Sequence, residues 1–267
     1  MTRHRHWQQL LPGYQERLPG PALAGWVERY CRLQGSADTG QPLHPEGGCG
    51  LLFNFGDPIL IDGAVLASPG IVSGPALRTQ ELAPVGRFDL LSVRFLPGRA
   101  WPFLGPLDAL AGMTLTPGQW HCPLALSELG ERMSGQAFDA QVALLEAALA
   151  QCLMEADGGS IGQALALIQS ARGQLSISTL AEQLGAGRRR LERQFKAQLG
   201  LSPKQYSRLQ RVKGARRLLR SRGEHGLADT AYQAGYWDQA HFIRDFKAVL
   251  GLTPGQYLAH LKRRYGN

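Results

Sequence analysis

A fourteen-residue phrase occurs twice in this chain and constrains its fold more than any other feature. The first copy starts at Arg193 and the second at Arg244, 51 residues later, and both read Arg-x-Phe-Lys-Ala-x-Leu-Gly-Leu-[Ser/Thr]-Pro-x-Gln-Tyr. The glycine suits the end of a helix, Ser or Thr suits an N-cap, and Pro suits a first helical position. Gln three residues after the Ser or Thr completes a capping box. Each copy therefore predicts the end of one helix, a turn and the start of another.

A short helix and a glycine turn precede the helix that ends in each copy. In the first copy a capping box of Thr179 with Glu182 predicts the start of the short helix, and Gly185 ends it. In the second copy Gly235 takes that place, and Asp238 is the expected N-cap of the next helix. Each second helix carries one apolar stripe, formed by Leu191, Phe195 and Leu199 in one copy and by Phe242, Phe246 and Leu250 in the other. This is the pattern of a helix-turn-helix.

The spacing of the two copies shows that their turns differ in length. The glycines Gly185 and Gly235 are 50 residues apart, whereas Phe195 and Phe246 are 51 residues apart. The second turn is therefore one residue longer than the first. Two helical hairpins could also be packing architecture alone, although a helical solenoid needs more than two repeats.

The side of each second helix opposite its stripe is polar, and in the first copy it is densely cationic. A helix-turn-helix places the N-terminal residues of its second helix, the recognition helix, in the major groove of DNA. Arginine can bind guanine with two hydrogen bonds, glutamate can accept from cytosine, glutamine suits adenine, and a small alanine suits a thymine methyl. The predicted base-reading residues are Arg189, Glu192, Arg193, Gln239, Ala240, His241 and Arg244. For His241, ordinary solvated surface is an equally good interpretation.

A linker helix is expected between the hairpins, from residue 203 to about residue 220. At about 1.5 Å per residue it would span roughly 27 Å, which approaches the roughly 34 Å of one DNA turn. Such a rod could hold two recognition helices in adjacent major grooves on one face of the duplex. Contacts to phosphates position a protein without reading sequence. The residues predicted to contact phosphates are Arg188, Arg190, Lys196, Arg208, Arg211 and Lys247.

Charge and composition divide the chain into two halves. Residues 1–159 carry ten Lys and Arg against fifteen Asp and Glu, a net −5, whereas residues 160–267 carry nineteen against six, a net +13. The second half therefore suits a polyanionic partner. The stretch 155–160, with its paired glycines, reads as a hinge. We predict domains at 1–157 and 160–267, with hairpins at about 177–199 and 227–250.

The first half reads mainly as β-structure. Asp62-Gly63 between two apolar runs is a strong hairpin signal, and short strands separated by Gly and Pro turns favour a small barrel or sandwich. A helical period follows at 138–153. The predicted fold class is therefore α+β, an N-terminal β-domain followed by an all-α domain. The chain shows no apolar run long enough for a membrane span and no secretory signal, so we expect a cytoplasmic protein. Its four scattered cysteines suggest neither a disulfide scaffold nor a zinc site.

The C-terminal hundred or so residues resemble the DNA-binding domain of the AraC/XylS transcription regulators. The resemblance rests on "LADTAYQAGYWDQAHFIRDFKAVLGLTPGQY", and Trp237 departs from it by standing where a polar or small residue is more usual. The resemblance implies two helix-turn-helix motifs joined by a linker helix. It also places the seven predicted base-reading residues where family members touch bases, and it implies RNA polymerase as a partner.

The first half resembles the sensor half of one AraC-type subset, in "PALAGWVERYCRL", "PEGGCGLLFNFGD" and "SVRFLPGRAWPFLG". That resemblance implies a cupin-like β-barrel that binds an effector, forms a homodimer, or both. One hypothesis is that an effector cavity is bordered by Phe53, Phe55, Arg94 and Trp101. The two phenylalanines could instead be plain core, and Arg94 could pair with a carboxylate such as Asp89. The helix at 138–153 could form a dimer seam or pack on its own barrel.

We interpret the chain as a sequence-specific DNA-binding transcription regulator and expect it to be an activator. Double-stranded DNA is the expected partner, and we expect no membrane association, cofactor or metal. The chain contains none of the motifs of a nucleophilic, zinc-dependent or phosphate-binding enzyme, so we expect no catalysis. The alternatives are a DNA-repair or DNA-modifying enzyme anchored by its helical half, and an architectural DNA binder without sequence preference.

Overall fold

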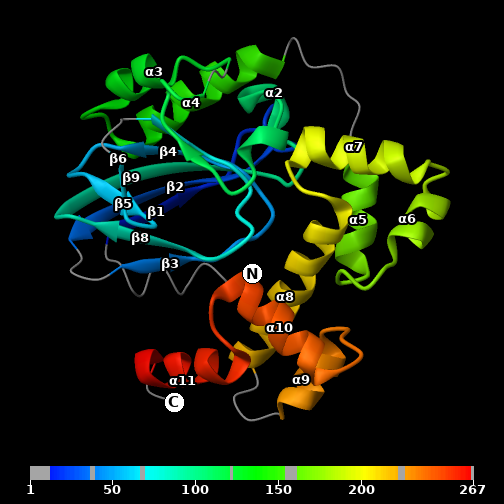
Figure 1. The fold of residues 1–267 in the computed structure, drawn as a ribbon. Helices are drawn as coiled ribbons and strands as arrows, with labels where there is room; N and C mark the ends of the chain where they lie inside the picture. Colours follow the sequence, from blue (N-terminus) through cyan, green and yellow to red (C-terminus); the bar gives the residue numbers. More distant parts are fainter. Residues whose placement is uncertain are drawn as a thin grey trace.

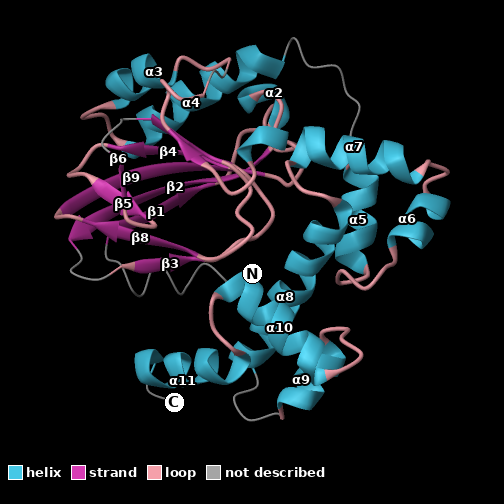
Figure 2. Ribbon diagram, viewed as in Figure 1, coloured by secondary structure: helices cyan, strands magenta, loops and turns pink. Residues whose placement is uncertain are grey.

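The computed structural model describes residues 13–36, 40–66, 70–120, 123–153, 161–221 and 226–265, with side chains described up to residue 263. Figure 1 and Figure 2 show a β-rich N-terminal part followed by a purely helical part. This order confirms the predicted α+β fold class. The predicted hinge at 155–160 lies outside the described residues, so the exact domain boundary stays a prediction.

The strands of the first part form two antiparallel sheets. One has the order β1-β2-β9-β4-β7-β10 and the other has the order β3-β8-β5-β6. The strands are β1 Gly13–Arg17, β2 Val27–Ser36, β3 Gln41–Leu43, β4 Gly50–Asn54, β5 Ile59–Ile61, β6 Ala64–Leu66, β7 Gly70–Ser73, β8 Gln80–Pro84, β9 Arg87–Phe95 and β10 Thr114–Leu115. Two separate sheets among the described residues fit the sandwich alternative and form no closed barrel of the cupin-like kind that the resemblance implies. The predicted hairpin turn is confirmed, with positive φ angles of 51° at Asp62 and 81° at Gly63.

The six-stranded sheet lies between the smaller sheet and a layer of helices (Figure 1). These helices are α2 Trp101–Leu104, α3 Leu126–Met133 and α4 Phe138–Leu153, with a 3-10 turn at Asp108–Leu110. Alternate residues of β9 serve the two layers, because Leu91 and Val93 pack toward the helices while Leu90 packs toward the smaller sheet. Leu145 and Leu149 of α4 are fully buried against the large sheet. The apolar stripe at 138–153 is therefore covered within the chain itself.

The second part consists of helices whose ends follow the capping signals of the sequence. They are α5 Gly162–Ser170, α6 Ile177–Gln183, α7 Arg188–Leu199, α8 Pro203–Ser221, α9 Leu227–Gln233, α10 Gln239–Leu250 and α11 Pro254–Tyr265. Both capping boxes of the repeated phrase are present: the Ser202 N–H donates to Gln205 Oε1 at 2.8 Å, and the Thr253 N–H donates to Gln256 Oε1 at 2.9 Å. Gly200 and Gly251 end α7 and α10 in the left-handed conformation.

One capping prediction was wrong. The N-cap of α6 is Ser176, whose side chain accepts a hydrogen bond from the Thr179 N–H at 3.0 Å. Thr179 therefore lies one turn inside the helix, and α6 begins three residues earlier than the predicted capping box with Glu182 implies. Two competent capping residues stand three positions apart here, and the earlier one is used.

The two parts pack directly on each other. The Leu107 N–H donates to the Ala197 carbonyl of α7 at 3.1 Å, and the Thr79 N–H donates to the Val249 carbonyl of α10 at 2.8 Å. The approach is close at Gly47, where a Cβ would lie 2.7 Å from the Tyr206 ring of α8. Both recognition helices are thus hydrogen-bonded at their C-terminal halves to the β-domain. Within the described residues no helix is long and apolar enough to cross a membrane.

Glu46 is the main ionic contact between the parts. It lies between β3 and β4, and one carboxylate oxygen accepts from Arg94 of β9 at 2.9 Å. The other oxygen pairs with Arg216 of α8 at 3.2 Å, and Lys213 Nζ lies 3.9 Å from the oxygen that Arg94 contacts. The Arg216 side chain is only 8% exposed. A buried cation needs a carboxylate partner, so Glu46 allows α8 to lie against the β-domain.

His44 lies close to this contact and is held neutral. Its Nδ1 is 2.9 Å from Thr79 Oγ1, and its ring meets Tyr257 of α11 edge-on. Burial, reinforced by the nearby charges of Arg216 and Arg220, lowers the pKa of His44 to about 3, against a smaller opposing effect of Glu46. The imidazole therefore belongs to the packed interface in its uncharged form.

We expect His44 to make the fold weaker in mild acid. Because its folded pKa is lowered, the neutral form stabilises the fold above its ordinary pKa of about 6.5, and that stability is lost as the pH falls toward the folded value. Denaturant unfolding of the full chain should show a loss of at most about 1.4 kcal/mol per pH unit from this group. His44→Asn should flatten the slope, whereas His260→Asn, on the exposed side of α11, should leave it unchanged. An unaltered slope in His44→Asn would contradict this origin.

Candidate nucleic-acid interface

The first hairpin consists of α6 and α7, joined by a turn at Gly185. Leu191, Phe195 and Leu199 of α7 are buried in the core of the helical part, as the stripe predicted. The opposite side of α7 is open to solvent, and its exposed residues include Arg188, Arg189, Arg190, Glu192, Arg193 and Lys196. The nearest ion pair, Arg188 with Glu192, is long at 3.9 Å and joins two largely exposed side chains, so it restrains them little.

The second hairpin consists of α9 and α10. Phe242 and Phe246 are fully buried, while Gln239, Ala240 and Arg244 are exposed and His241 is half-buried. The side chain of Asp238 accepts a hydrogen bond from the His241 N–H at 2.7 Å, which confirms the predicted N-cap of α10. All seven residues predicted to read bases therefore lie on α7 or α10, and six of them are exposed.

The turns of the two hairpins can be aligned from their hydrogen bonds. The Ala186 N–H donates to the Ala181 carbonyl, and the Tyr236 N–H donates to the Ala231 carbonyl, both at 3.0 Å. Ala186 and Tyr236 are therefore equivalent positions. The N-caps that follow are Gly187 and Asp238. Trp237 is consequently the additional residue of the second turn, and its side chain is 99% exposed.

Helix α8 separates the two hairpins and contacts α5, α7, α9, α10 and α11. It has 19 residues, which corresponds to roughly 28 Å at about 1.5 Å per residue. Figure 1 shows α7 near one end of α8 and α10 near the other. The two recognition helices are thus fixed to one rigid helix at different points along its length.

Asp245 of α10 holds the second recognition helix on α8. Its carboxylate is 9% exposed and lies 3.2 Å from Arg208 Nε and 3.4 Å from a terminal nitrogen of Arg211. The other terminal nitrogen of Arg211 donates to the Gly173 carbonyl at 2.6 Å, and the guanidinium lies over the Tyr236 ring. His241 Nε2 is 3.4 Å from the same carboxylate. The buried acid therefore joins α10 to α8, and Arg211 extends this contact to Gly173 and Tyr236.

These contacts revise two of the six predicted phosphate contacts. Arg211 is only 18% exposed, and its side chain makes contacts inside the domain, so we withdraw it from the predicted phosphate contacts. Arg208 is 40% exposed and shares Asp245, so a phosphate would have to compete with that ion pair. The exposed members of the predicted set are Arg188, Arg190, Lys196 and Lys247. The sequence did hint that Asp245 is buried and paired, because it stands beside Phe246 at the edge of the apolar stripe.

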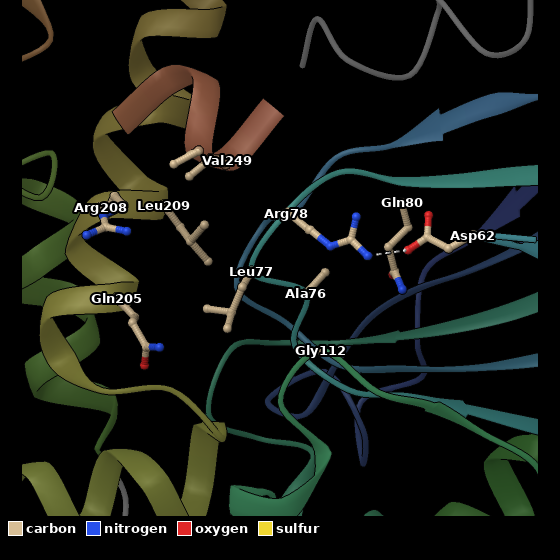
Figure 3. Close-up of a pocket in the computed structure, with 11 residues that line it drawn as sticks. Asp62, Ala76, Leu77, Arg78, Gln80, Gly112, Gln205, Arg208, Leu209 and Val249 are labelled. Atoms are coloured by element: carbon tan, nitrogen blue, oxygen red, sulfur yellow. Dashed lines mark hydrogen bonds and ion pairs between the residues drawn. The ribbon is translucent and has the colours of Figure 1, made fainter. Parts of the chain in front are cut away.

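The four residues predicted for an effector lie in different surroundings. Phe53 is fully buried in the core between the large sheet and its helices, and Phe55 and Trp101 pack against that core. Arg94 pairs with Glu28 at 2.9 Å and with Glu46, whereas Asp89 pairs with Arg32. A different hollow, of about 330 Å³, lies between the two parts of the molecule (Figure 3). Its described lining includes none of the four.

The hollow joins the β-domain to α8 and α10. Figure 3 shows Leu77 and Leu209 projecting into it from opposite sides, with Arg78 paired to Asp62 on one wall and Arg208 on the other. The Arg78–Asp62 distance is 3.3 Å. Within the described part of the chain, no group of three or more His, Cys, Asp or Glu side chains could hold a metal ion, and Cys31 and Cys49 are free thiols.

Comparison with known proteins assigns a class to the helical part. The family model of a helix-turn-helix domain matches residues 180–260, and a model of a domain of unknown function (DUF6597) matches residues 15–115. An AraC-like protein of Streptomyces lividans is 35% identical over 85 residues, which are 32% of this chain and 28% of that protein. The transcriptional activator RhaS of Escherichia coli is 36% identical over 81 residues, which are 30% of this chain and 29% of RhaS. This chain thus matches less than a third of the length of these curated relatives.

Two solved structures are similar to parts of this chain. The DNA-binding domain of AdpA, solved in complex with a target DNA, is 26% identical and covers 40% of this chain and 96% of its own, with a TM-score of 0.38. ToxT from Vibrio cholerae is 11% identical and covers 86% of this chain and 98% of its own, with a TM-score of 0.49. The sequence matches carry the assignment: the C-terminal part of this chain is a helix-turn-helix domain of the AraC type, preceded by a domain of unknown function.

Proposed function

We propose that this chain is a sequence-specific DNA-binding transcription regulator that acts as an activator. The observation that carries the proposal is the pair of recognition helices, α7 and α10. Each buries one face and exposes the other, and the exposed face is densely cationic on α7 and more mixed on α10. One rigid helix, α8, joins the two recognition helices. Its length of roughly 28 Å is close to the roughly 34 Å repeat of DNA. The net charge of +13 over residues 160–267 adds attraction to a polyanion.

In this proposal the two recognition helices enter adjacent major grooves. Arg189, Glu192 and Arg193 would read one half of the site. Gln239, Ala240, His241 and Arg244 would read the other. Activation would come through RNA polymerase, a step that rests on the resemblance to AraC-type activators. We further propose a cytoplasmic location and no enzymatic activity, since the relatives that share the matched domain are transcription regulators.

We also propose that the hollow between the two parts is a site for a small-molecule effector. Its volume of about 330 Å³ is in the range of small-ligand pockets, and its wall combines apolar side chains with Arg78 and Arg208. A ligand there would touch the β-domain, α8 and α10 together. Its binding would therefore be coupled to the position of α8 and α10 relative to the β-domain. The predicted residues Phe53, Phe55, Arg94 and Trp101 remain the alternative location.

Selection of duplexes from a random pool by the full-length protein, followed by sequencing and footprinting, tests the main proposal. We expect one positioned footprint spanning two adjacent major grooves. Weak, unpositioned protection would favour an architectural binder, and turnover of a modified base would favour the enzyme alternative.

Substitutions on the recognition helices should separate base reading from general attraction. Arg193→Ala and Arg244→Ala should each cost about 1–3 kcal/mol on the selected duplex and relax base preference at one position. Lys196→Ala should weaken all sequences alike and lower the slope of log K against log salt by about 0.9. Binding measured on the selected duplex and on single-base variants checks both results. Identical behaviour of the three variants would refute the assignment of base readers.

Arg211→Ala should act on stability instead. The substitution removes the hydrogen bond to Gly173, the pairing with Asp245 and the contact with Tyr236, so we expect a loss of about 2–3 kcal/mol in the free energy of unfolding. The control is Arg217→Ala, an exposed arginine on the same helix, which should leave stability unchanged. Denaturant unfolding of both variants measures the difference. Equal stability of the two variants would return Arg211 to the predicted phosphate contacts.

An effector in the hollow should stabilise the full chain against heat. We expect a ligand from a metabolite screen to raise the melting temperature of the natural protein and to lose this effect in Ala76→Phe, which fills the hollow. Ala259→Phe, a control on the exposed side of α11, should keep the response. A ligand whose effect persists in Ala76→Phe would place the site elsewhere.

A further inference from the structure

Trp237 is the most exposed large apolar side chain in the described part of the chain. It is 99% exposed, compared with 81% for Tyr232 and at most 69% for the others of this kind. A single exposed apolar residue needs no explanation in itself, because much of any protein surface is apolar. The place of Trp237 in the fold is what distinguishes it.

The tryptophan occupies a position that the first hairpin lacks. The turn between α6 and α7 passes from Ala186 directly to the N-cap Gly187, while the turn between α9 and α10 inserts Trp237 before its N-cap. The residues on both sides of the insertion are fixed, since Tyr236 is buried and Asp238 caps α10. The insertion therefore changes the surface at the start of the recognition helix and leaves the core unchanged.

Trp237 stands next to the residues proposed to read bases. Asp238 has an extended backbone, with φ −143° and ψ 157°, so the Cα atoms of Trp237 and Gln239 are separated by about 7 Å at most. Gln239 and Ala240 are exposed at the same end of α10. Any surface that receives these two side chains also comes within reach of the larger indole.

The second recognition helix has fewer cations than the first. The first turn of α7 contains three consecutive arginines, Arg188 to Arg190. By contrast, α10 is capped by Asp238 and starts with Gln239 and Ala240, and its cations, Arg244 and Lys247, lie further on. The N-terminal end of α10 therefore has little electrostatic attraction for a phosphate. An indole supplies another kind of contact, because its flat face packs on a deoxyribose and its N–H can donate to a phosphate oxygen.

We propose that Trp237 contacts the sugar–phosphate backbone of duplex DNA beside the bases read by Gln239 and Ala240, and that the longer second turn positions it there. The proposal rests on the DNA-binding function proposed above. The contact is mainly apolar and neutral, so it adds affinity at the second half-site without adding to the salt dependence of binding.

The test uses the full chain and a duplex recovered by selection from a random pool. Trp237→Ala should weaken binding by about tenfold, equivalent to about 1.4 kcal/mol, while Trp237→Phe stays within about threefold of the natural protein. Because the side chain is exposed, the melting temperature of Trp237→Ala should not change. The slope of log K against log salt should also stay the same, whereas the matched phosphate variant Lys247→Ala should lower it by about 0.9.

Fluorescence gives a direct reading of the contact. Binding of the duplex should quench or shift the tryptophan emission of the natural protein. Part of this change should be missing in Trp237→Phe, which retains binding.

A matched control for the loss of an exposed apolar side chain is Val85→Ala in the β-domain, which should bind DNA like the natural protein.

Unchanged affinity in Trp237→Ala, together with impaired binding in Arg193→Ala and Arg244→Ala, would overturn the inference while the DNA-binding function stands. The same holds if Trp237→Ala alters only self-association or the binding of another protein. If selection recovers no preferred duplex and the arginine variants bind like the natural protein, the proposed function itself fails.

Discussion

Helix α8 carries one buried apolar face along its length, and the neighbouring helices pack against this helix. The face is formed by Tyr206, Leu209, Val212, Ala215 and Leu219. Helices of 7 and 12 residues, such as those of the two hairpins, are marginal on their own in water. Their apolar stripes become buried only in the single core that α8 organises. The exposure of the polar faces of α7 and α10 is a consequence, because the stripes decide which side of each helix turns inward.

Two carboxylates extend this packing with ionic contacts. Asp245 joins α10 to Arg208 and Arg211 of α8, and Glu46 joins α8 to Arg94 of the β-domain. Both acids are largely buried, and each gathers two or more cations from elements distant in sequence. The strand β9, the linker helix and the second recognition helix are therefore connected through consecutive ion pairs. The hollow lined by Arg78 and Arg208 lies beside this connection and touches α8 and α10.

Helix boundaries could be predicted from the sequence because capping is local. Ser202, Thr253 and Asp238 bond to backbone or side chains three residues away, so the pattern itself contains the interaction. Ser176 shows the limit of this reasoning, since two capping residues in one segment compete and the pattern alone does not rank them.

Contacts between distant segments could not be predicted in the same way. Arg211 looked like a phosphate contact because arginines on a basic helix are usually solvated. Its partner Gly173 is 38 residues away, and only the fold brings the two together. The exposure of most of the predicted base-reading residues was easier to predict, since the helical period and the buried stripe leave few alternatives for the opposite side of each helix. The two-sheet arrangement depends on strand pairings that alternation of apolar residues does not specify.

The continuity of α8 has an implication for how this architecture can vary. An α-helix turns by about 100° for each residue, so one residue inserted in the middle of α8 would rotate everything beyond it by that angle. The second hairpin would then point away from the direction faced by the first, and the acids at 46 and 245 would lose their arginines. Insertions or deletions in α8 consequently keep the two hairpins aligned only when their length is close to a whole number of helical turns. The angle between the two hairpins is therefore set by the number of residues in α8 and not by their identity.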